Sequence, residues 1–247
     1  MKINDHLFLV GGGDYGFNLS NRLDANSYII DTGEGLWMID AGFDGGEAVL
    51  ANIKADGLDP QQITHLFVTH YHADHAGALG FMRKSLSRDL KIAIAGSVAE
   101  KVRAGDEEDN GLRWAKSFNF YPPDFTLEPC DVAVELADGQ QFKAGRFALT
   151  SIATDGHCRG HMCFLVSGGP GGYLFSGDHI FWGGKIILQN VTDSSVQQYA
   201  ASMNTLLGYE FEALLPGHLN FSMRNGRRHV EAAAGQFNKI GLPSNLL

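Results

Sequence analysis

The chain has 247 residues, of which 44% are hydrophobic and 19% charged, so it can bury a large core without disulfide bonds. Its formal net charge of -9 argues against a nucleic-acid partner, because such partners are bound by basic surfaces. The three cysteines, Cys130, Cys158 and Cys163, contain no CxxC pair, which excludes a disulfide framework and a structural zinc knot. No apolar run reaches the roughly 18 residues of a membrane span, so we expect a cytoplasmic protein with no membrane partner.

Strand-like and helix-like segments alternate along the chain. In the first half we expect strands at 27–30 and 36–39 that form a hairpin, a helix at 45–57, a strand at 63–68, a helix at 75–86 and a strand at 91–95. In the second half we expect strands near 131–136, 147–152, 162–167, 172–176 and 213–215, with helices near 194–207 and 227–240. There is no repeat and no low-complexity linker, so the pattern predicts a single layered α/β domain over residues 1–247.

An HxHxDH motif at positions 70–75 directly follows the strand expected at 63–68. Four metal-binding side chains within six residues are hard to explain by packing. In a turn at the strand end, His70 and His72 can face one side while Asp74 and His75 face a second point. This arrangement suits two adjacent cations better than one, and the alternative is a solvated polar loop.

Three later segments weaken that alternative, because each places a ligand-type residue beside glycine just after an apolar strand. They are Asp155-Gly156-His157, Ser176-Gly177-Asp178 and Pro216-Gly217-His218. Glycine lets the backbone turn sharply there, so the side chain can project from the strand end. Together with the motif, these segments supply five imidazoles and two carboxylates, a set that suits Zn²⁺, with Fe or Mn as substitutes.

From Asn26 and the turn at 40–42 to His218, the order and type of these residues resemble the metallo-β-lactamase superfamily, in particular its glyoxalase II-like and lactonase-like hydrolases. The resemblance implies a four-layered αβ/βα sandwich that binds two zinc ions per chain. It assigns one ion to His70, His72 and His157, the other to Asp74, His75 and His218, and both to a bridging Asp178.

For such a site we expect hydrolysis of a small lactone, ester or thioester. Two cations about 3.5–4 Å apart can share a hydroxide that attacks the substrate carbonyl, and they can stabilise the oxyanion that forms. The catalytic proton acceptor is expected to be Asp74, which would pass the proton to the leaving group.

Ligand type separates this chain from several branches of the superfamily. β-Lactamases usually lack a carboxylate at the position of Asp178, and the flavodiiron branch has a glutamate in place of His72. The segment 156–161 resembles the GHxxGH of lactonases and glyoxalase II, although Asp155 replaces the usual proline and Phe181 stands where signal lactonases have tyrosine. A phosphodiesterase-type or β-lactamase-like activity stays an alternative, and so does a metal-binding sensor without turnover.

Residues 96–130 break the regular pattern, and we predict that they form an insertion covering the site. Together with a later stretch, they are expected to line an apolar substrate pocket through Trp114, Phe118, Phe120, Tyr121, Phe181 and Trp182, with Lys185 meeting a carboxylate. The alternative makes these rings core or dimer contacts, and a homodimer is compatible with the sequence. Whether Tyr71, His161 and His179 orient the ligands or only pack is left open.

Overall fold

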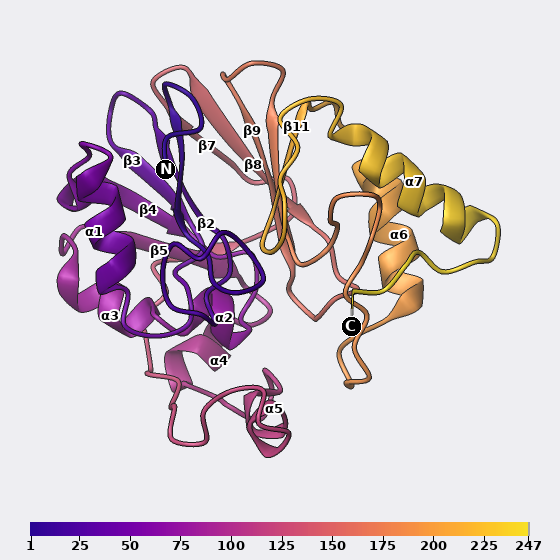
Figure 1. Cartoon of the computed structure of the whole chain (residues 1–247), viewed down its shortest axis with the longest axis horizontal. Coiled ribbons are helices and arrows are strands. Elements are labelled where there is room, and N and C mark those ends of the chain that lie inside the picture. Colours follow the sequence, from indigo (N-terminus) through magenta and orange to yellow (C-terminus); the bar gives the residue numbers. More distant parts are fainter. Residues whose placement is uncertain (247) are drawn as a thin grey trace. The chain divides into compact units, whose positions relative to one another are not determined.

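The computed structural model describes residues 1–246. The chain divides into two compact units, Met1–Glu135 and the part from Leu136 onward, which are described separately. In each unit helices lie beside a β-sheet (Figure 1). Over residues 1–246, the helices are all too short or too polar to cross a membrane.

The first unit is built on a six-stranded sheet with the order β1-β2-β3-β4-β5-β6. Its strands are β1 (Leu7–Gly11), β2 (Ser27–Asp31), β3 (Leu36–Ile39), β4 (Ile63–Phe67), β5 (Lys91–Ala95) and β6 (Val134–Leu136). Strands β1, β2 and β3 pair antiparallel, whereas β4 pairs parallel with both β3 and β5. Because parallel strands end at the same edge of a sheet, the residues that follow β3 and β4 meet there.

The helices of the first unit include those expected from the sequence and others that were not predicted, among them two within residues 96–130. They are α1 (Glu47–Ala55), the 3₁₀ helix η1 (Pro60–Gln62), α2 (Ala73–Ala76), α3 (Leu79–Ser85), α4 (Ala99–Ala104) and α5 (Leu112–Ser117). Helix α1 lies against β1, where the side-chain amide of Asn52 donates to the carbonyls of Val10 and Leu19 at 2.9 and 2.8 Å. The helices α1 and α3 lie on one side of the sheet (Figure 1).

The helix expected at 75–86 is two helices, α2 and α3, which are separated at Gly77. A Cβ atom at Gly77 would stand 2.0 Å from the carbonyl oxygen of Phe43, so the chain passes this carbonyl too closely for any side chain. The next amide, of Ala78, donates to the carbonyl of Gly42 instead of continuing α2. The break leaves the second half of the HxHxDH motif on a short helix of its own.

The second unit contains a five-stranded sheet with the order β11-β10-β9-β8-β7. Its strands are β7 (Gln141–Ala144), β8 (Phe147–Ala153), β9 (Met162–Ser167), β10 (Tyr173–Gly177) and β11 (Ala213–Pro216). The four strands from β7 to β10 pair antiparallel, and β11 pairs parallel with β10. Strands β10 and β11 therefore end at the same edge, where Asp178 and His218 follow them.

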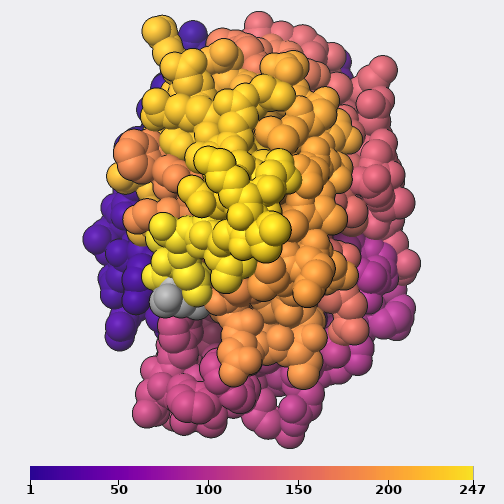
Figure 2. All heavy atoms as spheres, turned by 90° about the vertical axis from the view of Figure 1, so that its right-hand side faces the viewer, coloured from indigo at the N-terminus to yellow at the C-terminus, as the bar shows by residue number. Residues whose placement is uncertain are grey.

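Two helices, α6 (Val196–Leu206) and α7 (Arg227–Asn238), pack together against this second sheet. Their apolar residues Tyr199, Met203 and Val230 share one buried cluster with Ile152 and Leu174 of the strands. In Figure 2 the orange and yellow atoms of the C-terminal part, which include both helices, form the face toward the viewer. The protein is thus mixed α/β with two sheets, as the sequence predicts.

Candidate metal centre

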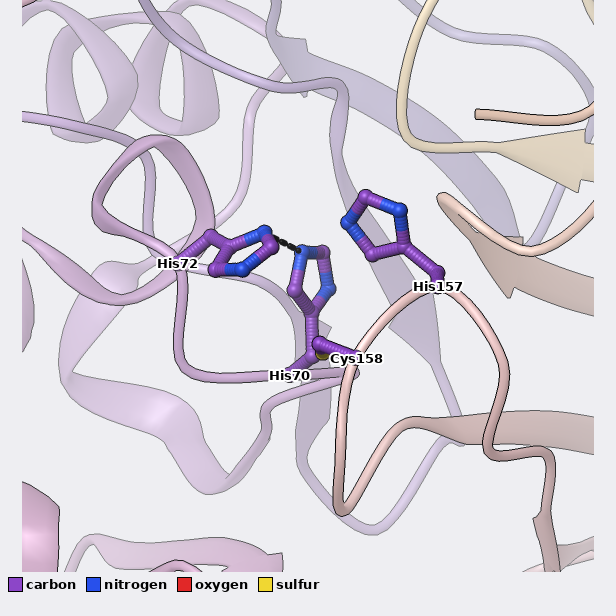
Figure 3. A group of neighbouring side chains, drawn as sticks. All are labelled: His70, His72, His157 and Cys158. Atoms are coloured by element: carbon purple, nitrogen blue, oxygen red, sulfur yellow. Dashed lines mark hydrogen bonds between the residues drawn. The ribbon is translucent and has the colours of Figure 1, made fainter. Parts of the chain in front are cut away.

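In the first unit, the HxHxDH motif begins three residues after β4 and brings two imidazoles together. The Nε2 atom of His70 lies 3.1 Å from the Nδ1 atom of His72, the contact dashed in Figure 3. The other ring nitrogen of His70, Nδ1, lies 3.1 Å from the hydroxyl of Thr69. Nε2 of His70 and Nδ1 of His72 therefore lie close enough together to bind the same cation.

His75 is oriented by a buried carboxylate. Its Nδ1 atom lies 2.8 Å from Asp40 Oδ2, and Asp40 also accepts hydrogen bonds from the backbone amide and hydroxyl of Thr69. Asp40 directly follows β3 and has a positive φ of 59°, a conformation that aspartate adopts more readily than most residues. A carboxylate on Nδ1 fixes the ring and leaves Nε2 as its metal-binding atom, the usual arrangement for a histidine ligand.

Asp74 lies on α2 with its two carboxylate oxygens in different surroundings. Its Oδ1 atom accepts a hydrogen bond of 2.9 Å from the hydroxyl of Tyr121, and its Oδ2 atom is 3.7 Å from Nε2 of His75. The backbone carbonyl of Asp74 accepts from the amide of Ala25 at 3.0 Å. Three of the four donors of the motif, His70, Asp74 and His75, are buried.

In the second unit, His157 follows a glycine that the fold requires. Gly156 has a φ of 143°, and a Cβ atom there would meet the backbone of Tyr199 at 2.7 Å. The Nδ1 atom of His157 lies 3.0 Å from the carbonyl oxygen of Ile187, so the ring donates there and presents Nε2 as its acceptor. Cys158, drawn beside His157 in Figure 3, is fully buried, and burial raises the pKa of its thiol well above its ordinary value.

Asp178 stands between two histidines of the second unit. Its Oδ2 atom is 3.8 Å from Nε2 of His157 and 3.5 Å from Nε2 of His218. It follows β10 directly, whereas His218 comes two residues after β11. A carboxylate oxygen facing two imidazole nitrogens fits the bridging position that the family resemblance implies for Asp178.

His161 supports Asp178, which answers one question that the sequence left open. The backbone amide of Asp178 donates to Nε2 of His161 at 3.2 Å, so the proton of this neutral ring lies on Nδ1, 2.9 Å from the hydroxyl of Thr154. His179 differs: it is fully buried, its ring stacks on Tyr199 at 4.6 Å, and burial, together with the charge of His157, lowers its pKa to about 3. His161 positions Asp178, and His179 is a neutral packing residue.

The residues proposed for the substrate pocket fall into two groups. Trp114, Phe118, Phe120 and Trp182 are between 49% and 66% exposed, which excludes them from the core, and Lys185 is exposed as well. Tyr121 and Phe181 are buried instead. Tyr121 packs against Phe43 with its hydroxyl on Asp74, and the ring of Phe181 stacks beside His218 at 6.4 Å.

The turn at 40–42 is visible in the sequence, but neither the role of Asp40 nor its contact with Thr69 was predicted. A carboxylate at the end of a buried strand, next to the strand that leads into the motif, is the signal that points to Asp40. Tyr199 was also missed. Its hydroxyl donates to the carbonyls of Ile187 and Asp178, 2.8 and 3.1 Å away, and thereby links the backbone near two donors.

The sequence profile of the metallo-β-lactamase superfamily matches residues 20–218, which include every predicted donor. The chain belongs to this superfamily. A solved structure of a mutant metallo-β-lactamase from Cronobacter sakazakii superposes with a TM-score of 0.73 and 22% identity, over 97% of this chain and 95% of that chain. At this identity the likeness concerns the fold, and it confirms the fold family predicted from the sequence.

Two curated relatives of this superfamily member are fungal thioesterases. Thioesterase pkgB of Emericella nidulans is 25% identical over 193 residues, 78% of this chain and 45% of that protein. An atrochrysone carboxyl ACP thioesterase of Aspergillus fumigatus is 24% identical over 195 residues, 78% of this chain and 50% of that protein. The chain spans about half the length of these relatives.

Proposed function

We propose that this protein is a metal-dependent hydrolase that binds two transition-metal ions, zinc in the first place, with iron or manganese as substitutes. The donors are His70, His72 and His157 for one ion and Asp74, His75 and His218 for the other, with Asp178 shared between them. This assignment follows the superfamily pattern in the sequence. It is supported by the fit of the donor types to zinc, nitrogen from imidazoles and oxygen from carboxylates.

The observation that carries the proposal is the position of Asp178 Oδ2, within 3.8 Å of one imidazole nitrogen and 3.5 Å of another. Buried carboxylates and imidazoles are costly to keep together unless they hydrogen-bond or bind a cation. Here the Nδ1 atom of His75 contacts the carboxylate of Asp40, and the Nδ1 atom of His157 contacts the carbonyl oxygen of Ile187. A partner on one ring nitrogen fixes the ring and thereby orients the other nitrogen, which is the usual support of a histidine metal ligand.

When bound, the ions would polarise a substrate carbonyl and lower the pKa of a water molecule. The chain's own residues supply orientation and a place for the proton. We assign Asp74 to accept the proton that this water loses. The proton would go to Oδ2, because Oδ1 already accepts a hydrogen bond from the hydroxyl of Tyr121. Asp40 and His161 act through their neighbours by holding the ring of His75 and the backbone of Asp178.

Within the esters, lactones and thioesters expected for this site, we propose an acyl thioester as the substrate class. The names of two curated relatives support this choice, since both are thioesterases. The exposed rings of Trp114, Phe118 and Phe120 provide an apolar surface that suits an acyl chain. A small-molecule thioester or one carried on a partner protein has the same reacting group.

The test compares specificity constants of the zinc-loaded protein for four substrates: an acyl-N-acetylcysteamine thioester, an acyl-homoserine lactone, a chromogenic cephalosporin and bis(p-nitrophenyl) phosphate. The proposal predicts that kcat/KM is highest for the thioester, by about tenfold or more. A preference for the cephalosporin or the phosphodiester would contradict the substrate class. Zinc binding without turnover of any of the four would contradict an enzyme and favour a sensor.

A further inference from the structure

The segment 96–130 contains a buried half as well as an exposed one. Tyr121, Phe125 and Leu127 form one cluster with Phe43, from the turn after β3, and with Ala73 of the metal-binding motif. The ring of Tyr121 stacks on Phe43 with centroids 5.1 Å apart and an interplanar angle of 9°. The segment is thus packed onto the loop that carries the donors.

Two hydrogen bonds join this segment to the motif at separate points. The hydroxyl of Tyr71 donates to the carbonyl of Asp109 at 2.7 Å, and the hydroxyl of Tyr121 donates to Asp74 Oδ1 at 2.9 Å. The second bond connects residues 47 positions apart, and both residues are buried. A tyrosine hydroxyl that donates to one oxygen of a carboxylate restricts its rotation and turns the other oxygen to a set direction.

We propose that Tyr121 is a positioning residue that sets the orientation of Asp74 and thereby the metal affinity of the site. The hydroxyl holds Oδ1, and Oδ2 then points toward Nε2 of His75, 3.7 Å away. The stack on Phe43 and the packing on Ala73 keep the phenol ring where this bond is made. The segment 96–130 therefore serves the metal site as well as the substrate. This inference rests on the proposed function, because it requires Asp74 to be a ligand.

The experiment is the zinc affinity of the Tyr121→Phe variant, measured by competition with a chromogenic chelator on the metal-free chain. Phenylalanine keeps the ring and its stack and removes only the hydroxyl. Loss of a group that orients a metal ligand is expected to weaken zinc binding about 10- to 100-fold. In the hydrolysis assay kcat should fall while KM stays within about twofold, because the substrate surface is unchanged.

The matched control is Tyr28→Phe, which also removes a buried hydroxyl in the first unit, one bonded to the side chain of Asn26. Its melting temperature should fall in the metal-free state as that of Tyr121→Phe does, while its zinc affinity stays at the wild-type value. Zinc affinity of Tyr121→Phe within twofold of wild type would overturn the positioning role and leave the proposed function intact. A wild-type chain that binds no zinc would overturn both.

Discussion

At the residue scale, Asp178 is the candidate donor on which the proposal of two metal ions, as opposed to one, depends most. Its Oδ2 faces the Nε2 atoms of His157 and His218, and its backbone amide is held by His161. A carboxylate shared by two cations contributes to both, so its loss acts on the whole site. The surrounding histidines each serve one ion in the assignment proposed above.

We predict that Asp178→Ala lowers metal content and hydrolysis together. Neither ion keeps its shared ligand, so metal content should fall well below wild type and kcat/KM should drop by about 100-fold or more. Elemental analysis and the thioester assay measure the two effects. Asp89→Asn, at an exposed position, is the control for charge and should match wild type. Unchanged turnover of Asp178→Ala would remove this residue from the site.

The candidate donors could be singled out in the sequence because they stand in a dense motif or beside glycine at strand ends. Their supports could not, because Asp40 and Thr69 are 29 residues apart in the chain and meet only when β3 and β4 pair. Likewise, nothing in the spacing of His161 separates a packing histidine from one that accepts the amide of Asp178. Roles that depend on long-range contacts require the folded chain.

At the scale of elements, the strands with continuous apolar runs were predicted well, among them β2, β3, β9 and β10. Two strands were missed for opposite reasons. The glycines at 11–13 cut short the apolar run of β1, although all five of its residues are buried, and β7 has the sequence QFKA, an edge strand with no buried residue. The break after α2 was missed because the carbonyl of Gly42, which accepts a hydrogen bond from the amide of Ala78, lies 36 positions away in the sequence.

The exposed half of segment 96–130 leads to the second prediction. Trp114→Ala and Phe120→Ala should lower kcat/KM for the preferred substrate by about 1–3 kcal/mol of transition-state binding. Their melting temperatures should stay near wild type, because both rings are about half exposed. The control is Leu112→Ala, on the same helix as Trp114, a buried residue whose truncation should cost about 2–5 kcal/mol of stability. Unaltered substrate preference in both aromatic variants would sink the pocket hypothesis.

The third prediction concerns Glu107, which holds segment 96–130 together. One carboxylate oxygen bonds Lys116 at 2.7 Å and the other accepts the amide of Leu127 at 3.0 Å. Burial raises the pKa of Glu107, but Lys116 and this amide outweigh it, so the pKa lies below its ordinary value of 4.5. Glu107 therefore stabilises the fold above the ordinary pKa, and this contribution is lost as the pH falls through the lowered pKa.

Accordingly, Glu107→Gln should destabilise the metal-free chain by about 1–3 kcal/mol at pH 7, since a partly buried, hydrogen-bonded ion pair is broken. The difference from wild type should shrink when unfolding is measured at progressively lower pH. Denaturant titrations of both proteins at pH 7 and pH 4 give the comparison. A difference that grows on acidification would mean that Lys116 and the amide do not hold this carboxylate in its charged form.

At the scale of the whole molecule, fold class and family were predictable because the candidate donors follow the superfamily's order along the sequence. The family profile matches residues 20–218, which include all of them. A compact chain with two sheets brings strand ends into one region of each unit, and the donors stand at those ends. Substrate identity is not encoded in the same way, since specificity usually lies in loops, and we predict this role for the segment 96–130. The proposed count of two metal ions, by contrast, rests on the seven candidate donors and needs no knowledge of the substrate.

Metal content tests the central claim most directly. The protein is purified from zinc-supplemented cells and checked for folding by circular dichroism. Its zinc content is measured by inductively coupled plasma mass spectrometry and divided by the protein concentration from amino-acid analysis. Two sets of donors that share Asp178 predict about two zinc ions per chain. One ion or none in a folded, zinc-supplemented sample would contradict the two-metal site.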